Sequence, residues 1–450
     1  MTLTGKIAYF LIIFVVIFTA LAYGTVHQPI IALFYFLVAA LAILWAIDGL
    51  RTGSMRFSPS LLQLPIYAAA AYGFFQVIPF GWYGEAGVDN IPRTISLDPF
   101  STEVNAIHFL ALGLFFSVTL SVLDSAKRVR RLVTIITIFG FIFAFFAILQ
   151  GVLSPTKIYG IYERQFAQPY GSFVNRHNFA AYMEMTVALP LGLLLTGSIK
   201  RDQRLLYLTA IVLMAVALFL SGSRGGFVAL VAELILLVML TAPIRGAKSI
   251  VVRVALAGAI LIAVIVGTIF VGGESSLTRI AETASSKDVT TNRTHIWEVT
   301  VDVIKDNLPF GAGLGAFGVA YTPTDNLSGL ERAEQAHNDY LQTLSDAGVV
   351  GGLIGIAFLF FLIRTVVRNV RRQNDFRRAV AIGATAGIFA VLVHSIFDFV
   401  LHTTAIAVLF LVLLALLVTA GFQYPDDLLN DDLRRPRRKG SVHRLRFGSS

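Results

Sequence analysis

Residues 273–297 read GESSLTRIAETASSKDVTTNRTHIW, residues 306–318 read DNLPFGAGLGAFG, and residues 331–348 read ERAEQAHNDYLQTLSDAG. These stretches belong to one polar segment, residues 272–347, in a chain that is otherwise mostly apolar. A helix that crosses the hydrocarbon core needs about 20 apolar residues, which this segment does not supply. We therefore expect apolar helices on either side to hold the polar segment against one face of a membrane.

The composition indicates a membrane protein with many spans. Of the 450 residues, 56% are hydrophobic and 14% are charged, and the mean hydropathy is +0.75. A soluble domain carries about 25% charged residues, so this chain is not of the soluble class. The chain has no cysteine, which excludes disulfides and thiolate metal sites. The first apolar run lacks a small-residue cleavage site, and we interpret it as a retained helix.

The apolar runs predict an all-α polytopic membrane protein with about twelve transmembrane helices and one large periplasmic loop region that bears short helices. We divide the chain into helices 1–9 (residues 1–271), the loop with the catalytic segment (272–347), helices 10–12 (348–421) and a basic cytoplasmic tail (422–450). The twelve predicted spans are residues 7–23, 29–47, 61–79, 104–123, 132–153, 178–196, 205–220, 226–241, 251–271, 348–366, 379–400 and 404–421.

The distribution of positive charge predicts the orientation. With a cytoplasmic N-terminus, the inward segments hold 26 of the 36 Lys and Arg residues. Cytoplasmic loops of membrane proteins carry such an excess, so we expect both termini inside and residues 272–347 outside. The basic tail around residues 434–439 has two interpretations, attraction to anionic membrane lipids or binding of nucleic acid. We favour membrane lipids and expect no nucleic-acid partner.

Three arginines are expected at the outer face. Arg224 lies in a Gly/Ser-rich turn between two spans, Arg293 precedes an amphipathic helix pattern, and Arg176 opens the sixth span. Guanidinium groups bind phosphate oxygens in pairs, so together they indicate an anion site. Each has a simpler interpretation: a snorkelling turn residue, a solvated loop residue, or a neighbour of the helix cap Asn175.

His337 is the candidate general base, because an imidazole accepts a proton near neutral pH. Either Glu334 or Asp339 is expected to orient it, although a loop histidine is often incidental. His394 and Asp398 are four residues apart and would share one helix face, where they either bond each other or shape a substrate cavity. We expect no metal, because the histidines lack ligand spacing, and no dinucleotide at Gly313–Gly318, because no strand–helix unit accompanies that glycine motif.

Five short motifs follow one another between residues 171 and 399. They are GSFVNRHNFAAY (171–182), SGSRGG (221–226), NRTHIW with NLPFGAGLGAF (292–297 and 307–317), QAHNDYLQTLSDAGVVGG (335–352) and HSIFDF (394–399). Their order resembles the O-antigen ligase family, which includes polysaccharide polymerases and protein O-oligosaccharyltransferases.

The resemblance implies a glycosyltransferase of the bacterial inner membrane that needs no cofactor. Its donor would be a glycan on undecaprenyl pyrophosphate, and its acceptor a sugar hydroxyl of lipid A–core, reached from the periplasmic face. The family's pyrophosphate-binding arginines match Arg224 and Arg293, and its acceptor-activating histidine matches His337. Arg176 is an extension based on its local sequence. A direct displacement would invert the sugar carbon.

The motifs leave the acceptor open among lipid A–core, a growing polysaccharide and a protein. A transporter of lipid or polysaccharide is the main alternative from another class. It would place charged residues deep within spans or break helices in two corresponding halves, whereas only Glu184 and Glu233 lie clearly inside spans here. A scaffold would give no reason for arginines and a histidine to gather on one face.

Overall fold

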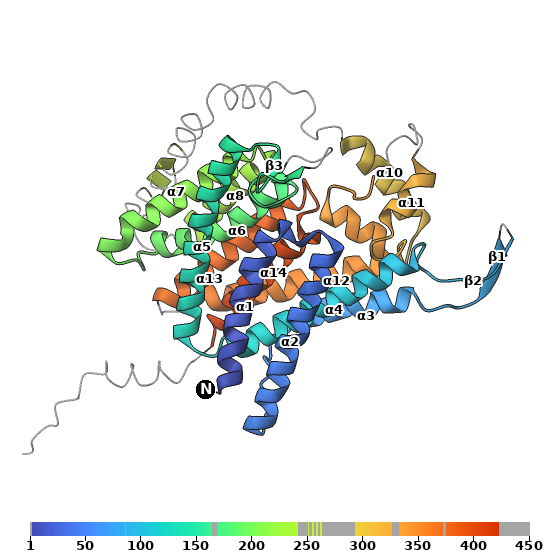
Figure 1. Ribbon diagram of the computed structural model, residues 1–450, viewed down its shortest axis with the longest axis horizontal. Helices are drawn as coiled ribbons and strands as arrows, with labels where there is room; N and C mark the ends of the chain where they lie inside the picture. Colours follow the sequence, from blue (N-terminus) through green and yellow to red (C-terminus); the bar gives the residue numbers. More distant parts are fainter. Residues whose placement is uncertain are drawn as a thin grey trace, which may run out of the picture.

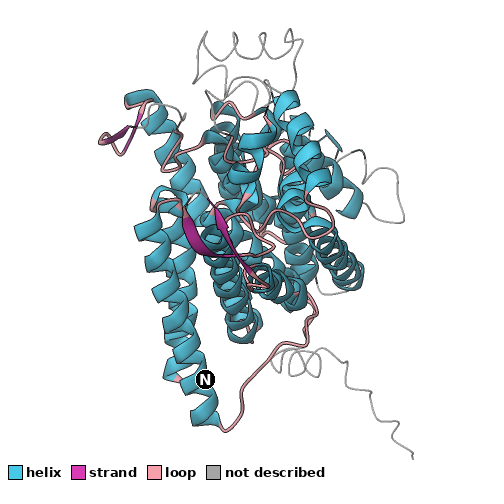
Figure 2. Cartoon of the chain, turned by 90° about the vertical axis from the view of Figure 1, so that its right-hand side faces the viewer, coloured by secondary structure: helices cyan, strands magenta, loops and turns pink. Residues whose placement is uncertain are grey.

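A computed structural model of the chain describes residues 2–85, 87–163, 169–241, 293–325, 333–371 and 375–422, with a few single positions between 251 and 262. Helices make up most of this part (Figures 1 and 2). They are α1 (Leu3–Leu21), α2 (Gln28–Thr52), α3 (Gln63–Gln76), α4 (Pro99–Val122), α5 (Ala126–Leu153), α6 (Arg176–Leu195), α7 (Arg204–Leu220), α8 (Arg224–Thr241), α10 (Arg293–Asp306), α11 (Phe317–Thr324), α12 (Asp339–Val370), α13 (Asp375–His394) and α14 (Thr404–Thr419).

Short antiparallel hairpins and 3-10 turns complete the described part of the chain. Strands β1 (Trp82–Glu85) and β2 (Val88–Pro92) pair in a hairpin that projects away from the helices (Figure 1). Strands β3 (Lys157–Ile158) and β4 (Tyr162–Glu163) form a smaller one. The 3-10 turns are η1 (Tyr23–Thr25), η2 (Arg201–Gln203) and η3 (Val400–His402). The prediction of an all-α chain is therefore correct for its helices and omitted two hairpins.

Nine helices in the described residues are long and apolar enough to span a membrane: α1, α2, α4, α5, α6, α7, α8, α12 and α13. The predicted span 404–421 is the shorter α14, of 16 residues. The predicted span 61–79 contains α3, whose 14 residues rise only about 21 Å, less than the roughly 30 Å of hydrocarbon. The predicted span 251–271 and the tail beyond residue 422 lie outside the described residues. The chain is a multi-pass membrane protein, and the count of twelve stays a prediction.

Contacts between helix ends sort the connections into two groups. At one end, Tyr159 donates to Leu21 O, Ser172 to Ala20 O and the Asp339 amide to Ser395 O. At the opposite end, Thr4 bonds Asp48, Arg56 pairs with Asp124, Arg130 lies over the Phe376 ring and Arg378 donates to Leu240 O. This sorting agrees with the alternation of the predicted spans. We call the first group the site end.

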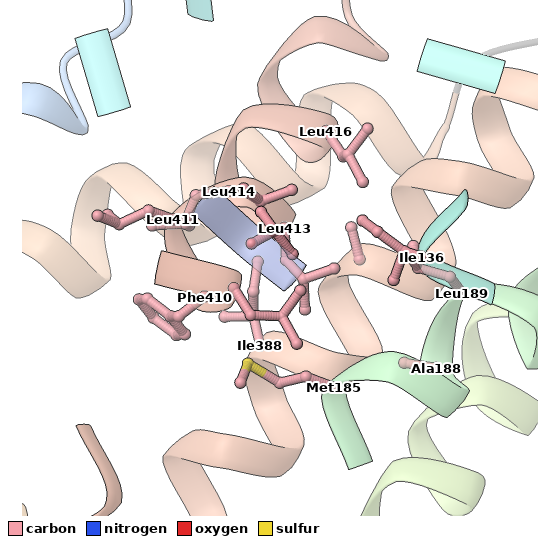
Figure 3. Packing of buried hydrophobic residues seen from close by; sticks show 14 of the residues in the cluster. Ile136, Met185, Ala188, Leu189, Ile388, Phe410, Leu411, Leu413, Leu414 and Leu416 are labelled. Atoms are coloured by element: carbon pink, nitrogen blue, oxygen red, sulfur yellow. The ribbon is translucent and has the colours of Figure 1, made fainter. Parts of the chain in front are cut away.

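The core is built around α14, all of whose residues are buried. Its apolar side chains pack among residues of α5, α6 and α13 (Figure 3). Helices α6 and α13 approach closely where Gly192 faces Gly383, since a Cβ on Gly192 would lie 2.7 Å from Gly383 Cα. Small residues permit such backbone contact between membrane helices. The helices that reach the site end are thus held in a tightly packed frame.

The polar segment adds a small outer layer on this frame. Helices α10 and α11 pack around Val303 and Phe317, which are fully buried. The glycine-rich loop between them is structural: Gly311 has φ +77°, and a Cβ there would lie 2.5 Å from the backbone of Asp346. Helix α12 breaks at Gly348, with φ +57°, where its predicted span begins.

Candidate functional site

His337 lies at the site end in an unusual backbone conformation. Its φ is +50°, in the left-handed region that non-glycine residues rarely adopt. Both neighbours are fixed: Trp297 Nε1 donates to Ala336 O at 3.0 Å, and the Asn338 side chain caps α12 by accepting from the Tyr340 and Leu341 amides. Such over-determined strain is typical of functional positions, because it presents one side chain in one direction.

The His337 ring is held by Asp398. Nδ1 of His337 lies 3.1 Å from Oδ1 of Asp398, and the imidazole ring packs against the Phe399 ring in a T-shaped contact. An ionised carboxylate only accepts hydrogen bonds, so Nδ1 is the donor in this contact, and in a neutral imidazole the lone pair is then on Nε2. The side chain is 30% exposed, and Nε2 has no hydrogen-bond partner among the described residues. This is the arrangement of a general base oriented by an acid.

Asp398 connects several parts of the site. The residue is almost completely buried between α13 and α14, and its Oδ2 lies 3.1 Å from Arg293 Nη2 and 3.8 Å from His177 Nδ1. Burial alone would raise the pKa of the Asp398 carboxyl, but the hydrogen bond from His337 and the charge of Arg293 lower it well below its ordinary value. The carboxylate is therefore ionised at any physiological pH.

Arg293 is the first described residue of α10, which therefore includes it, whereas the sequence placed it just ahead of the amphipathic pattern. One guanidinium nitrogen donates to Phe397 O and another to Asp398 Oδ2. A guanidinium has five N–H donors, so donors remain for an external anion. Arg293 thus contacts the same carboxylate that holds the His337 ring.

Arg224 and Arg176 are the first residues of α8 and α6. Asn175 caps α6 through the His177 amide at 2.8 Å, which confirms the predicted capping role. Arg224 is half-buried and has no ion pair with the residues that the structure describes. Next to it, Gly225 packs so tightly that a Cβ would lie 3.2 Å from Phe397 Cβ. The residue that follows Arg224 in α8 therefore lies against Phe397, whose carbonyl accepts from Arg293.

The two residues expected to orient His337, Asp339 and Glu334, do not bond its ring. Asp339 does not bond His337 in the structure; it accepts from His402 at 2.8 Å and from Ser395 at 2.7 Å. Glu334 is exposed, and the hydrogen bond of the His337 ring goes to Asp398 instead.

The predicted helix-face pair also separates. Helix α13 ends at His394, so Asp398 lies beyond it on a turn, and His394 bonds Glu184 at 3.2 Å. The expectation that the two side chains bond each other is therefore wrong, because the helix stops too early.

Sequence reasoning missed three polar residues that complete the site: His177, Ser223 and Glu184. Ser223 Oγ lies 2.9 Å from His177 Nδ1 and 3.4 Å from His394 Nε2. The signals were available, since Ser223 precedes a helix start and Glu184 is an ionisable residue inside a span. Within the described residues, no group of three or more histidine and acidic side chains has the arrangement of a metal site.

Chemically, the site combines a fixed imidazole with guanidiniums from different helices.

A family model described as O-antigen ligase matches residues 209–356, one third of the chain. The matched segment includes Arg224, Arg293 and His337, whereas Arg176, His394 and Asp398 lie outside it. No curated protein matches the chain.

Proposed function

This chain belongs to the O-antigen ligase family, and from that premise we propose that it transfers a glycan from undecaprenyl pyrophosphate to a sugar hydroxyl at the periplasmic face of the bacterial inner membrane. Family membership supports a membrane protein that handles glycans. The donor, the acceptor and the chemistry are our proposal. The observation that carries it is the contact of His337 Nδ1 with the buried Asp398, which leaves Nε2 as a base.

On the acceptor side, Nε2 of His337 removes the proton of the attacking hydroxyl. That oxygen forms a bond to the anomeric carbon of the donor glycan, and the bond from this carbon to the phosphate oxygen breaks. The proton moves to His337, and the electron pair leaves with undecaprenyl pyrophosphate. A single displacement of this kind inverts the anomeric carbon.

On the donor side, the leaving pyrophosphate gains negative charge in the transition state. Arg224 and the unused donors of Arg293 are suited to bind it, and Arg176 is the third candidate. Guanidiniums fixed in a partly desolvated site stabilise such charge without reorganising. Neither a metal nor nucleotide energy enters this scheme. The polyprenyl chain would lie in apolar grooves between spans, among membrane lipids.

The role of Arg224 has a direct test. Arg224→Ala is expected to weaken binding of undecaprenyl pyrophosphate about tenfold or more, because a charge-assisted contact to phosphate is lost. Binding is measured on purified protein in nanodiscs. Arg204→Ala, at the opposite end of the bundle, serves as the control. Unchanged binding in Arg224→Ala would remove this residue from the donor site.

The branches of the family differ in the acceptor molecule that receives the glycan. We propose lipid A–core; O-antigen or exopolysaccharide polymerase and protein O-oligosaccharyltransferase are the alternatives. Purified protein is incubated with a defined undecaprenyl-linked glycan and, separately, lipid A–core, a second donor molecule or a pilin. Mass spectrometry identifies the product. A glycan joined to lipid A–core supports the ligase, and a product on another acceptor assigns that branch instead. Absence of any transfer would contradict the proposal.

A further inference from the structure

We infer that His177 and Ser223 are positioning residues that connect the donor-side Arg224 to the Asp398–His337 pair. The inference rests on the proposed function for its kinetic consequences, and on a chain of side-chain contacts for its geometry. Hydrogen bonds run from Glu184 through His394 and Ser223 to His177. Nδ1 of His177 then lies 3.8 Å from Asp398 Oδ2, which is a close approach and not a hydrogen bond.

Ser223 is the centre of this chain. Its side chain is buried, and its Oγ accepts from the Gly226 amide at 3.1 Å, which caps the first turn of α8. The same oxygen contacts the His177 and His394 rings, which come from α6 and α13. One hydroxyl therefore ties three helix ends together at the point where Arg224 begins.

The limited number of hydrogen bonds that the Ser223 hydroxyl can form couples the His177 and His394 rings. A hydroxyl has one hydrogen to donate and two lone pairs. One lone pair is used by the Gly226 amide, so the hydroxyl accepts from one imidazole and donates to the other. The tautomers of His177 and His394 are thus set together, and the completely buried Glu184 fixes the second ring through contacts of 3.2 Å to both carboxylate oxygens.

His177 lies between Ser223 and the Asp398 carboxylate that holds His337. Its Nδ1 points to Ser223 and lies 3.8 Å from Asp398 Oδ2, while the other oxygen of Asp398 holds His337. A change at Ser223 would loosen the helix start that presents Arg224. A change at His177 would loosen that start and the carboxylate of the base together. The two substitutions should therefore differ in their kinetics.

The kinetic test compares variants of the full-length protein in nanodiscs with a defined undecaprenyl-linked glycan. Ser223→Ala should raise the donor KM about tenfold with little change in kcat, the effect of one lost hydrogen bond at a binding group. His177→Ala should raise the donor KM and also lower kcat about tenfold. His177→Asn, which keeps a nitrogen donor near the position of Nδ1, should restore most of the loss.

Ser117→Ala is the matched control. Ser117 is also a buried serine, bonded to Tyr67 and Gln63 by side-chain hydrogen bonds, but it lies on α4 toward the opposite end of the bundle. Equal effects of Ser117→Ala and Ser223→Ala would overturn the inference. So would a His177→Asn protein no more active than His177→Ala.

A thermal cycle tests the coupling without turnover. Ser223 and Asp398 do not bond each other, so coupling between them is carried by the two residues that lie between them, His177 and His394. The Tm loss of the Ser223→Ala/Asp398→Asn double variant should differ from the sum of the single losses. Additive losses would overturn the inference. Non-additive Tm losses, together with a wild-type protein that transfers no glycan, would instead contradict the proposed function alone.

Discussion

His337 combines a strained backbone with a ring whose two nitrogens have separate tasks. Nδ1 is committed to Asp398. The neighbour Ala336 accepts from Trp297 of α10, and the neighbour Asn338 donates to Ile396 O in the turn that follows α13. Rotation of the ring away from this position would break the contact with an ionised, buried carboxylate. At the scale of the residue, the structure therefore holds the His337 ring in place without any bound substrate.

Replacement of the base should affect turnover and spare donor binding. His337→Gln is expected to lower kcat about a hundredfold or more, because general base catalysis contributes that much or more. Binding of undecaprenyl pyrophosphate should stay within about twofold of wild type, since the pyrophosphate is assigned to the arginines. Both quantities are measured in nanodiscs. Loss of donor binding in His337→Gln would show that this residue belongs to the donor site.

His402 gives the fold a pH dependence of known sign. Burial alone would lower the pKa of the His402 imidazole, but the hydrogen bond to Asp339 raises it above its ordinary value. A raised pKa stabilises the folded protein fully below the ordinary histidine value of about 6.5. That stabilisation is lost as the pH rises through the raised pKa.

The Tm of the wild type should consequently fall more steeply between about pH 6 and about pH 9 than the Tm of His402→Gln, measured in the same detergent or nanodisc. Parallel curves for the two proteins would contradict this prediction.

At the scale of elements, the sequence predicts what is local. The Gly/Ser turn at residues 221–223 separates α7 from α8 as expected, and Gly348 marks the start of the apolar part of α12. Composition and glycine placement suffice for such boundaries. The pairing of His337 with Asp398 was not predictable, because it joins residues 61 positions apart through the packing of α12 on the end of α13. The predicted span 61–79 is longer than α3, because the apolar residues after Gln76 lead into the β1–β2 hairpin and do not extend the helix.

Helix α3 supports the site from the half of the chain that carries little of the family resemblance. The buried Gln76 at its end donates to Phe310 O and Asp346 O and accepts from the Leu314 amide, so it fixes the glycine-rich loop against α12. Gln76→Leu would remove all three hydrogen bonds. Phe310 O and Asp346 O would keep the Tyr72 hydroxyl and the Gly313 amide as donors. The Leu314 amide would lose its acceptor, at a cost of about 2 kcal/mol.

We expect Gln76→Leu to lower both Tm and transfer activity. The matched control is Gln63→Leu at the other end of α3, where Gln63 bonds Ser58 O and Ser60 O. That variant should lower Tm and keep kcat close to wild type. Equal losses of activity in the two variants would show that α3 acts only through global stability.

At the scale of the whole molecule, one end of the bundle collects the candidate site and the other collects most of the positive charge. The positive-inside rule assigns the charged end to the cytoplasm. The site end would then face the periplasm, which the proposed reaction requires because its pyrophosphate donor and glycan acceptor meet there.

Single cysteines test this orientation cleanly, since the chain has none of its own. Ser54 follows α2 at the charged end, Thr156 follows α5 at the site end, and both are exposed. In intact spheroplasts a membrane-impermeant maleimide should label Thr156→Cys at once and Ser54→Cys only after lysis. The reverse pattern would place Arg224, Arg293 and His337 in the cytoplasm, and transfer at the periplasmic face would then be impossible for this protein.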